Sequence, residues 1–118
     1  MGQENLRLDV TVRDGVTVVR FLDAKILDEL AITDIGEQLK AIVKRADVPK
    51  LVLDFSTVTH MSSIALGVLI TLHKRIQEKQ GKLRLACIQP AIYEIFVITR
   101  LKEIFQIHPS VEDALASL

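Results

Sequence analysis

Two adjacent serines, Ser62 and Ser63, offer the most definite chemistry in this sequence. Both lie where an apolar segment and a polar loop run into a predicted helix. A serine hydroxyl at a helix N-terminus caps free backbone N–H groups and stabilises the helix by about 1 kcal/mol relative to alanine. A hydroxyl is also a phosphate acceptor, and the helix dipole stabilises the added negative charge. The spacing alone leaves both roles open.

Phosphorylation at this position would act as a binding switch. It would add a charge of about −1.5 to −2 to a loop that faces a partner. Desolvation and like-charge repulsion would then abolish the interface while the fold stays intact. The serines therefore indicate either a helix cap or a regulated contact with another protein.

The elements around the serines are typical of a parallel α/β junction. Leu51–Phe55 is a short, nearly all-apolar segment, of the kind that forms a strand buried on both faces of a parallel sheet. We expect the helix to begin at Ser62 or Ser63 and to stop at Gly81. Residues 55–73 carry no Asp, Glu, Lys or Arg, but their serines and threonines favour a strand–loop–helix junction over a membrane span. The apolar residues of this helix are Leu66, Leu69, Ile70, Leu72 and Ile76.

The remaining pattern completes one domain. Two β-type runs, Leu6–Thr11 and Val16–Phe21, flank Asp14-Gly15 and predict a β-hairpin. From Asp28 to Ala46 apolar residues recur at helical spacing, beginning with Leu30. The later predicted elements are a strand over 83–88, a helix over 91–99, a short strand over 105–107 and a helix from Ser110. This order predicts an α/β fold with a mixed, largely parallel sheet of four to five strands, an N-terminal hairpin and about four helices, in a single domain over residues 1–118.

The segment from Met61 to Leu69 resembles the signature of STAS domains in bacterial anti-sigma factor antagonists. The family loop reads roughly Met-Asp-Ser-Ser-Gly-Leu-Gly-Val-Leu, and this chain has Met-Ser-Ser-Ile-Ala-Leu-Gly-Val-Leu in the same register. The order of predicted elements also fits the family along effectively the whole chain. The resemblance therefore implies the STAS fold.

The resemblance also implies a phosphoacceptor. In the family, the first serine of the Asp-Ser-Ser trio is phosphorylated by an anti-sigma factor kinase, and this releases the antagonist. By register the acceptor here is Ser63, with Ser62 as the alternative. Ser62 stands in place of the family aspartate, Ile64 in place of the second serine and Ala65 in place of the glycine. These departures bear on phosphorylation, because the aspartate helps to define the site that the kinase reads.

The resemblance further implies that a protein partner binds around this helix start. From the residue pattern itself, Asp23 fits an ordinary turn or helix-capping acid, and Leu66 fits the buried stripe of the helix. The residues of the implied surface are Asp23, Ala24, Thr57, Thr59, His60, Ser62, Ser63 and Leu66.

Catalytic and metal chemistry find little support, and we expect no catalytic residue, metal or cofactor. Asp54 ends an apolar strand, but no second acid or base lies at a telling spacing around it. The three histidines are scattered and the chain has one cysteine, so no metal-binding pattern exists. His60 lies near the serines, where a histidine that titrates near pH ~6.5 would tune a phosphosite. Cys87 lies in an apolar run and is expected to be a buried, inert residue of a strand.

Composition excludes several partner classes. Fifteen basic and fifteen acidic residues cancel, and the chain has no Trp and one Tyr, so nucleic acid is not an expected partner. The N-terminus lacks the pattern of a secretory signal, and one cysteine favours the reducing cytoplasm. We expect no membrane insertion. Weak nucleotide binding, at the crevice beyond the parallel strand ends, is the remaining small-molecule hypothesis.

Two functions from different classes follow. The first is an anti-sigma factor antagonist that binds an anti-sigma factor kinase, regulates transcription in a bacterium and is controlled by serine phosphorylation at the start of the central helix. The alternative is a non-phosphorylated STAS accessory or scaffold subunit of a lipid-transport ABC system or a stress-signalling complex. Ser62 in place of the family aspartate favours the alternative, because a scaffold needs no kinase substrate.

Overall fold

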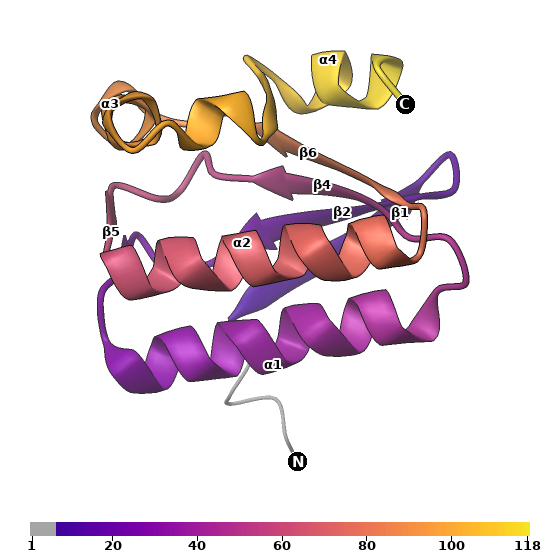
Figure 1. Ribbon diagram of the computed structural model, residues 1–118, viewed down its shortest axis with the longest axis horizontal. Helices are drawn as coiled ribbons and strands as arrows, with labels where there is room; N and C mark the ends of the chain where they lie inside the picture. The colour runs from indigo at the N-terminus through magenta and orange to yellow at the C-terminus, as the bar shows by residue number, and fades with distance from the viewer. Residues whose placement is uncertain (1–6) are drawn as a thin grey trace.

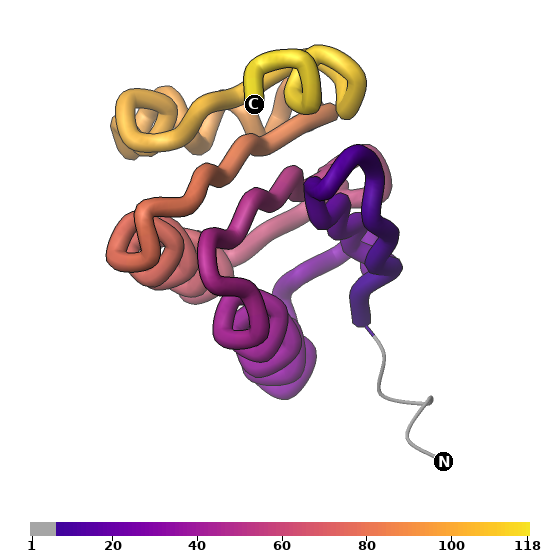
Figure 2. The backbone as a smooth tube through the Cα atoms, turned by 90° about the vertical axis from the view of Figure 1, so that its right-hand side faces the viewer, coloured from indigo at the N-terminus to yellow at the C-terminus, as the bar shows by residue number. Residues whose placement is uncertain are grey.

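The computed structural model of the chain describes residues 7–118 and contains a five-stranded sheet with helices packed against it (Figure 1). Helices α1 (Glu29–Arg45) and α2 (Ser63–Glu78) lie side by side, and α4 (Val111–Ala116) lies on the other side of the strands (Figure 2). The strands are β1 (Leu8–Arg13), β2 (Val16–Phe21), β4 (Lys50–Asp54), β6 (Lys82–Ala86) and β7 (Gln106–His108). Helix α3 (Pro90–Ile98) and the 3-10 helix η2 (Leu101–Glu103) connect β6 to β7.

The sheet confirms the predicted α/β class. Its strand order is β1-β2-β4-β6-β7, in which β1 and β2 are antiparallel and the other neighbours are parallel. The hairpin turn has positive φ angles at Asp14 and Gly15, 53° and 79°, which is the backbone that an Asp-Gly turn between twisted strands requires. Leu6 of the predicted first strand lies outside the described residues.

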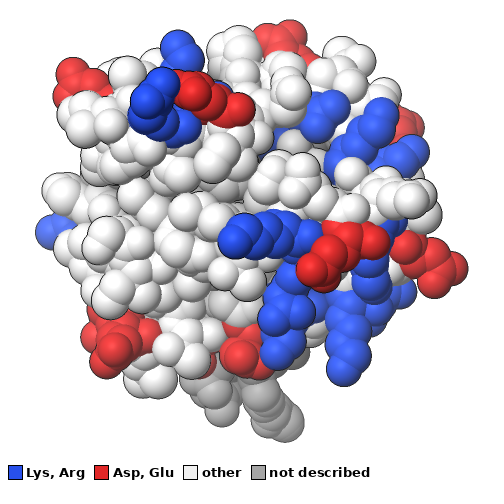
Figure 3. Space-filling model, in the orientation of Figure 1, with Lys and Arg blue, Asp and Glu red and all other residues white. Residues whose placement is uncertain are grey.

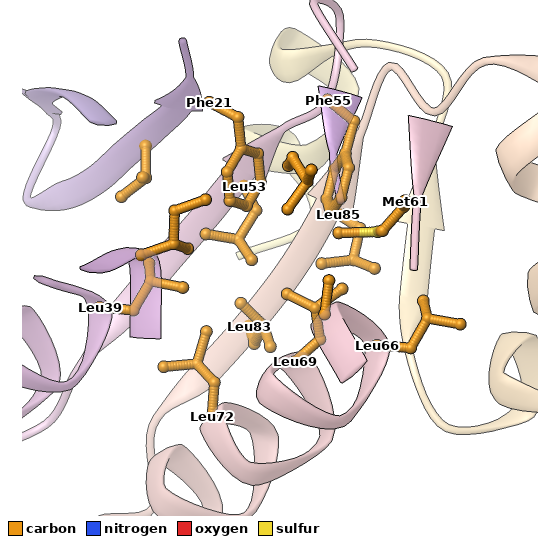
Figure 4. Packing of buried hydrophobic residues seen from close by; sticks show 14 of the residues in the cluster. Phe21, Leu39, Leu53, Phe55, Met61, Leu66, Leu69, Leu72, Leu83 and Leu85 are labelled. Atoms are coloured by element: carbon orange, nitrogen blue, oxygen red, sulfur yellow. The ribbon is translucent and has the colours of Figure 1, made fainter. Parts of the chain in front are cut away.

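The core follows from the alternation of side chains along the strands. Leu51 and Leu53 of β4 point toward α1 and α2, whereas Val52 points toward α4. Figure 4 shows the larger cluster, in which the rings of Phe21 and Phe55 pack 4.9 Å apart at the carboxyl ends of their strands. Burial on both faces explains why β4 is nearly all apolar.

The two long helices begin as the sequence predicts. Asp28 is the N-cap of α1, and its side chain accepts a hydrogen bond from the Ala31 N–H at 3.0 Å. Leu30, the first of the regularly spaced apolar residues, does not join the core. Leu30 is 66% exposed, and the buried stripe of α1 runs through its neighbours Ala31 and Ile32 instead.

The end of α2 also differs from the prediction. Gln80, and not Gly81, adopts the left-handed conformation at φ 58°. Gly81 allows the chain to pass close to the Pro49 carbonyl oxygen, because a Cβ at this position would overlap that atom. That carbonyl accepts the Lys82 N–H at 2.8 Å, which joins the start of β6 to the residue before β4.

The prediction that Cys87 is a buried residue of a strand was wrong. Strand β6 ends at Ala86, and Cys87 is half-buried with a left-handed φ of 61°. Burial, followed by the nearby Asp54 carboxylate, raises the pKa of the Cys87 thiol. The thiol therefore stays protonated, which agrees with the inert role expected from the sequence.

The uncharged stretch from 55 to 73 is divided among a turn, the short strand β5 (His60–Met61) and the first part of α2. Within residues 7–118 no helix combines the length and the apolarity needed to cross a bilayer.

His73, on α2, is expected to make stability depend on pH. Its ring packs edge-on against Phe105 at 5.4 Å, and burial lowers its pKa from the ordinary value of 6.5. Below that value the unfolded chain binds a proton that the folded protein does not yet bind. The free energy of unfolding should therefore fall as pH falls through 6.5 and toward the lower pKa of the folded state.

The measurement is urea unfolding of the wild type and His73→Gln at about pH 7.5 and about pH 5.5. The wild type should lose more stability than the variant on acidification, because the other titrating groups are common to both proteins. Equal losses would show that His73 contributes nothing to the pH dependence.

Candidate functional site at the start of helix α2

Ser62 is the N-cap of α2. Its backbone is extended (φ −86°, ψ 166°), and its Oγ accepts a hydrogen bond from the Ala65 N–H at 3.2 Å. Its backbone N–H donates to the Ile26 carbonyl at 3.1 Å. Ser62 is half-buried, so its hydroxyl serves the capping role that the sequence left open. The position that carries aspartate in the family is thus a cap that serine can fill without a charge.

Replacing Ser62 by alanine should reduce the free energy of unfolding by about 1 kcal/mol, because the Ala65 N–H loses its acceptor. Ser62→Asp is the matched control, since a carboxylate caps the same N–H and suits the positive end of the helix dipole. Chemical denaturation measures both. A Ser62→Ala protein as stable as the wild type would contradict the capping role.

Ser63 is the first residue of α2 and is exposed. Within residues 7–118 its side chain makes no hydrogen bond, and neither its backbone N–H nor that of Ile64 has a protein acceptor. These two N–H groups belong to the first turn of the helix, where the dipole is positive. A phosphoryl group on Ser63 would lie close to both of them. The geometry therefore suits an anionic modification at Ser63 better than at the capping Ser62.

Two loops that are distant in sequence meet beside the serines. Strand β3 (Lys25–Ile26) pairs in parallel with β5, in the register Lys25↔His60 and Ile26↔Met61. Just before this pair the Ala24 carbonyl accepts the N–H groups of Thr59 and His60, at 2.7 and 3.2 Å. The Thr59 hydroxyl lies 3.1 Å from the same carbonyl oxygen and 2.9 Å from Nδ1 of His60. The structure thus brings Ala24, Thr59 and His60 together at the helix start.

Asp23, in the loop just before β3, forms an ion pair. Its carboxylate lies 3.4 Å from one terminal guanidinium nitrogen of Arg7, and the Nε of Arg7 lies 3.7 Å from Asp34 on α1. Asp23 therefore has a structural partner, and it caps no helix. Thr57 is half-buried in the turn after β4, which the Gln89 side chain holds by donating to the Ser56 carbonyl at 3.0 Å.

Leu66 does not reach the surface of this site. It is 7% exposed and belongs to the main core, as its position in the apolar stripe indicates. Of the site residues predicted from the sequence, the exposed ones are Ala24, Thr59, His60 and Ser63. The Leu66 side chain is therefore not available for contact with a partner.

Three exposed apolar side chains at this end of the molecule were missed as site residues. Leu27 is 50% exposed directly after β3, Leu30 is 66% exposed in the first turn of α1, and Ile64 is 58% exposed in the first turn of α2. In Figure 3 lysines and arginines gather over the far ends of α1 and α2, and few of them lie at this end. Exposed apolar side chains with polar groups at their edge are typical of a protein-binding surface. The signal for Ile64 was its replacement of a family serine.

Asp54 has a structural role. Its Oδ1 accepts the Ser56 N–H at 2.9 Å, which fixes the turn after β4. Among residues 7–118 no three His, Cys, Asp or Glu side chains are grouped so that they could hold a metal ion. The exposed groups at the helix start are thus a hydroxyl, an imidazole and apolar side chains.

Comparison with known proteins places this geometry in context. A family model described as the STAS domain matches residues 7–114. The anti-sigma F factor antagonist of Paenibacillus polymyxa is 25% identical over 114 residues, which is 97% of this chain and 96% of that protein. An anti-sigma-factor antagonist (STAS) domain protein from Planctomyces limnophilus is 26% identical, with a TM-score of 0.84 over 93% of this chain and 96% of its own. The Bacillus cell fate determinant SpoIIAA in its phosphorylated form shares the fold, at 17% identity and a TM-score of 0.70 over 93% of this chain and 97% of its own.

Proposed function

This chain belongs to the STAS domain family, and on that premise we propose that it is an anti-sigma factor antagonist. Residues 1–118 form one STAS domain that binds an anti-sigma factor and so frees a sigma factor for transcription. The partner is an anti-sigma factor with serine kinase activity, and the place of action is the cytoplasm. The antagonists from Paenibacillus and Planctomyces support this proposal, because each is covered over nearly its whole length.

The observation that carries the proposal is the exposed Ser63 at the start of α2, next to exposed apolar groups. Leu27, Leu30 and Ile64 offer apolar area for burial against a partner, and His60 and Thr59 offer polar contacts at its rim. A phosphoryl group on Ser63 would place a charge of about −2 inside that contact. The phosphorylated protein would therefore keep its fold and lose its partner.

Ser63 is the proposed acceptor in preference to Ser62. The Ser62 hydroxyl already accepts the Ala65 N–H and is half-buried, so its modification would disturb the cap. Ser63 is free of such contacts within residues 7–118. A kinase that reads this site must do so without a carboxylate at position 62, and it meets the apolar Ile64 after the acceptor.

The test is displacement of a sigma factor. The purified protein is added to each complex of anti-sigma and sigma factor encoded by the same genome, and released sigma factor is measured by size-exclusion chromatography. Release from one complex, followed by re-formation of that complex after incubation with ATP, is the expected result. If the protein releases sigma factor from none of the complexes, the proposed function is wrong.

A constitutive scaffold or accessory subunit is the second candidate, and the changes at Ser62, Ile64 and Ala65 favour it. A scaffold uses the same surface without a kinase substrate, and Ile64 replaces a polar family residue with an apolar one that is 58% exposed. Intact-mass measurement of the protein isolated from its own cells separates the two. A phosphorylated fraction supports the switch, and its absence under all growth conditions supports the scaffold.

A further inference from the structure

A groove of about 500 Å³ lies between α1 and α2 and is lined by residues of both helices. Leu39 and Leu72, which are buried, form its floor. Ile64 and Val68 line the end of the groove near the start of α2. The groove is partly open to solvent. A site for a small molecule would usually enclose its ligand more fully than this.

Two glycines keep the groove free of side chains. Gly36 on α1 and Gly67 on α2 both line it, and each lies in a helix interior, where glycine is unfavourable relative to alanine. A Cβ at Gly67 would meet nothing within 4 Å, and one at Gly36 would meet only Val68, at an ordinary contact distance of 3.6 Å. Packing within the chain therefore requires neither glycine. Close approach of an external backbone would explain both.

Charge divides the groove along its axis. Toward the C-terminal ends of α1 and α2 it continues into a second hollow of about 280 Å³, lined by Lys40, Lys44, Arg75 and Lys79 together with one acid, Glu78. Lysines and arginines are prominent in this region of Figure 3. Within residues 7–118 no carboxylate forms an ion pair with Lys40, Lys44 or Arg75. The basic end thus carries four cationic side chains against one acid, Glu78, and the rest of the groove lining is apolar apart from Glu37 and Thr71.

We propose that this groove binds an amphipathic helix of a protein partner, with its apolar residues over Ile64, Val68 and Gly67 and its acidic residues over Lys40, Lys44 and Arg75. The two ends of the groove, Ile64 and Lys79, are about 22 Å apart at 1.5 Å per residue, which is the length of about four helical turns. A helix in a groove buries apolar residues spaced at i, i+3, i+4 and i+7, and the charge gradient sets its direction. This surface extends away from Ser63, and the proposal does not depend on an anti-sigma partner.

The probe is a fluorescent, hydrocarbon-stapled helical peptide of about 15 residues, with leucines at i, i+3, i+4 and i+7 in its first half and glutamates in its last two turns. Fluorescence polarisation measures its binding to the full chain. The control peptide carries lysines in place of the glutamates.

Two protein variants test the groove. The double variant Lys40→Glu with Arg75→Glu reverses the charge of the basic end, and Gly67→Leu fills the groove. Lys74→Glu is the matched control, because Lys74 is exposed on α2 outside the groove lining.

The expected result is saturable binding of the acidic peptide alone. The double charge reversal should weaken it at least about tenfold, Gly67→Leu should abolish it, and Lys74→Glu should leave it within about twofold. Gly67→Ala should raise the unfolding midpoint and weaken binding. Equal binding of both peptides, or binding that survives Gly67→Leu, would overturn the proposal. Binding of dodecanoate that responds to the variants in the same way would overturn the proposal, because the groove would then hold a lipid. Self-association of the protein that Gly67→Leu removes would also overturn it, because the groove would then hold a second copy of the chain.

Discussion

Ser63→Asp is expected to weaken binding of the anti-sigma partner by about 100-fold or more, which corresponds to about 2.7 kcal/mol. The carboxylate would be buried in the contact beside the apolar Ile64, where its desolvation costs free energy. The fold should not change, because an acid in the first turn of α2 suits the helix dipole. Titration calorimetry measures the affinity, and thermal unfolding verifies the fold.

The controls separate charge from size. Ser63→Asn has the shape of the aspartate without its charge, and Ser63→Ala removes only an exposed hydroxyl. Both should bind the partner within a few-fold of the wild type. An aspartate variant that binds as well as the asparagine variant would show that negative charge at Ser63 does not control the interaction. The proposed switch would then be lost, although the fold assignment would stand.

Gly81→Ala is expected to lower the free energy of unfolding by about 2 kcal/mol, the middle of the range for overpacked sites. The added Cβ would overlap the Pro49 carbonyl oxygen, and this atom is backbone and cannot rotate away. The same carbonyl accepts the Lys82 N–H at 2.8 Å, so relief of the overlap would pull β4 and β6 out of register. Urea denaturation of the purified variant measures the loss.

Gly67→Ala is the matched control for this prediction. It makes the same chemical change in the same helix–strand unit, but its Cβ meets no atom within 4 Å. It should raise the free energy of unfolding by about 0.5–1 kcal/mol, because alanine is the better helix former. If both variants lose stability equally, steric overlap at Pro49 is not the cause at Gly81.

Local physics made much of the fold predictable from the sequence. The Asp14-Gly15 turn needs positive φ at both residues, and few other pairs adopt it easily. Asp28 and Ser62 each cap a helix by a hydrogen bond that spans three residues. The apolar run of β4 is a direct consequence of burial on both faces. Each of these features depends on neighbours in the chain.

Features that depend on distant contacts were not predictable. Strands β3 and β5 are two residues each, and they exist because the Ala24 carbonyl meets Thr59 and His60, which no local pattern encodes. Leu30 opens the apolar pattern of α1, but the buried stripe runs through Ala31 and Ile32 and leaves Leu30 66% exposed. The sequence pattern predicts Gly81 as a helix stop, but the structure needs glycine there because the Pro49 carbonyl oxygen leaves no room for a Cβ.

The candidate site was predictable in position but not in detail. The serine pair identified the start of α2, and the side-chain geometry distinguishes the capping Ser62 from the exposed Ser63. The spacing of the two serines is compatible with either arrangement, because a helix can begin one residue earlier or later. The exposed apolar side chains at this end of the molecule come from two stretches of the chain, residues 27–30 and the start of α2, which only folding brings to the same end.

The central claim is that a partner binds around the start of α2, and hydrogen exchange of the protein with and without its anti-sigma partner tests it most directly. The N–H groups of Ser63 and Ile64 have no acceptor within residues 7–118 and should exchange rapidly in the free protein. In the complex, segments 57–64 and 23–27 should exchange more slowly, with Ser63 and Ile64 changing most. Unchanged exchange there, with protection confined to α3 or α4, would contradict the account.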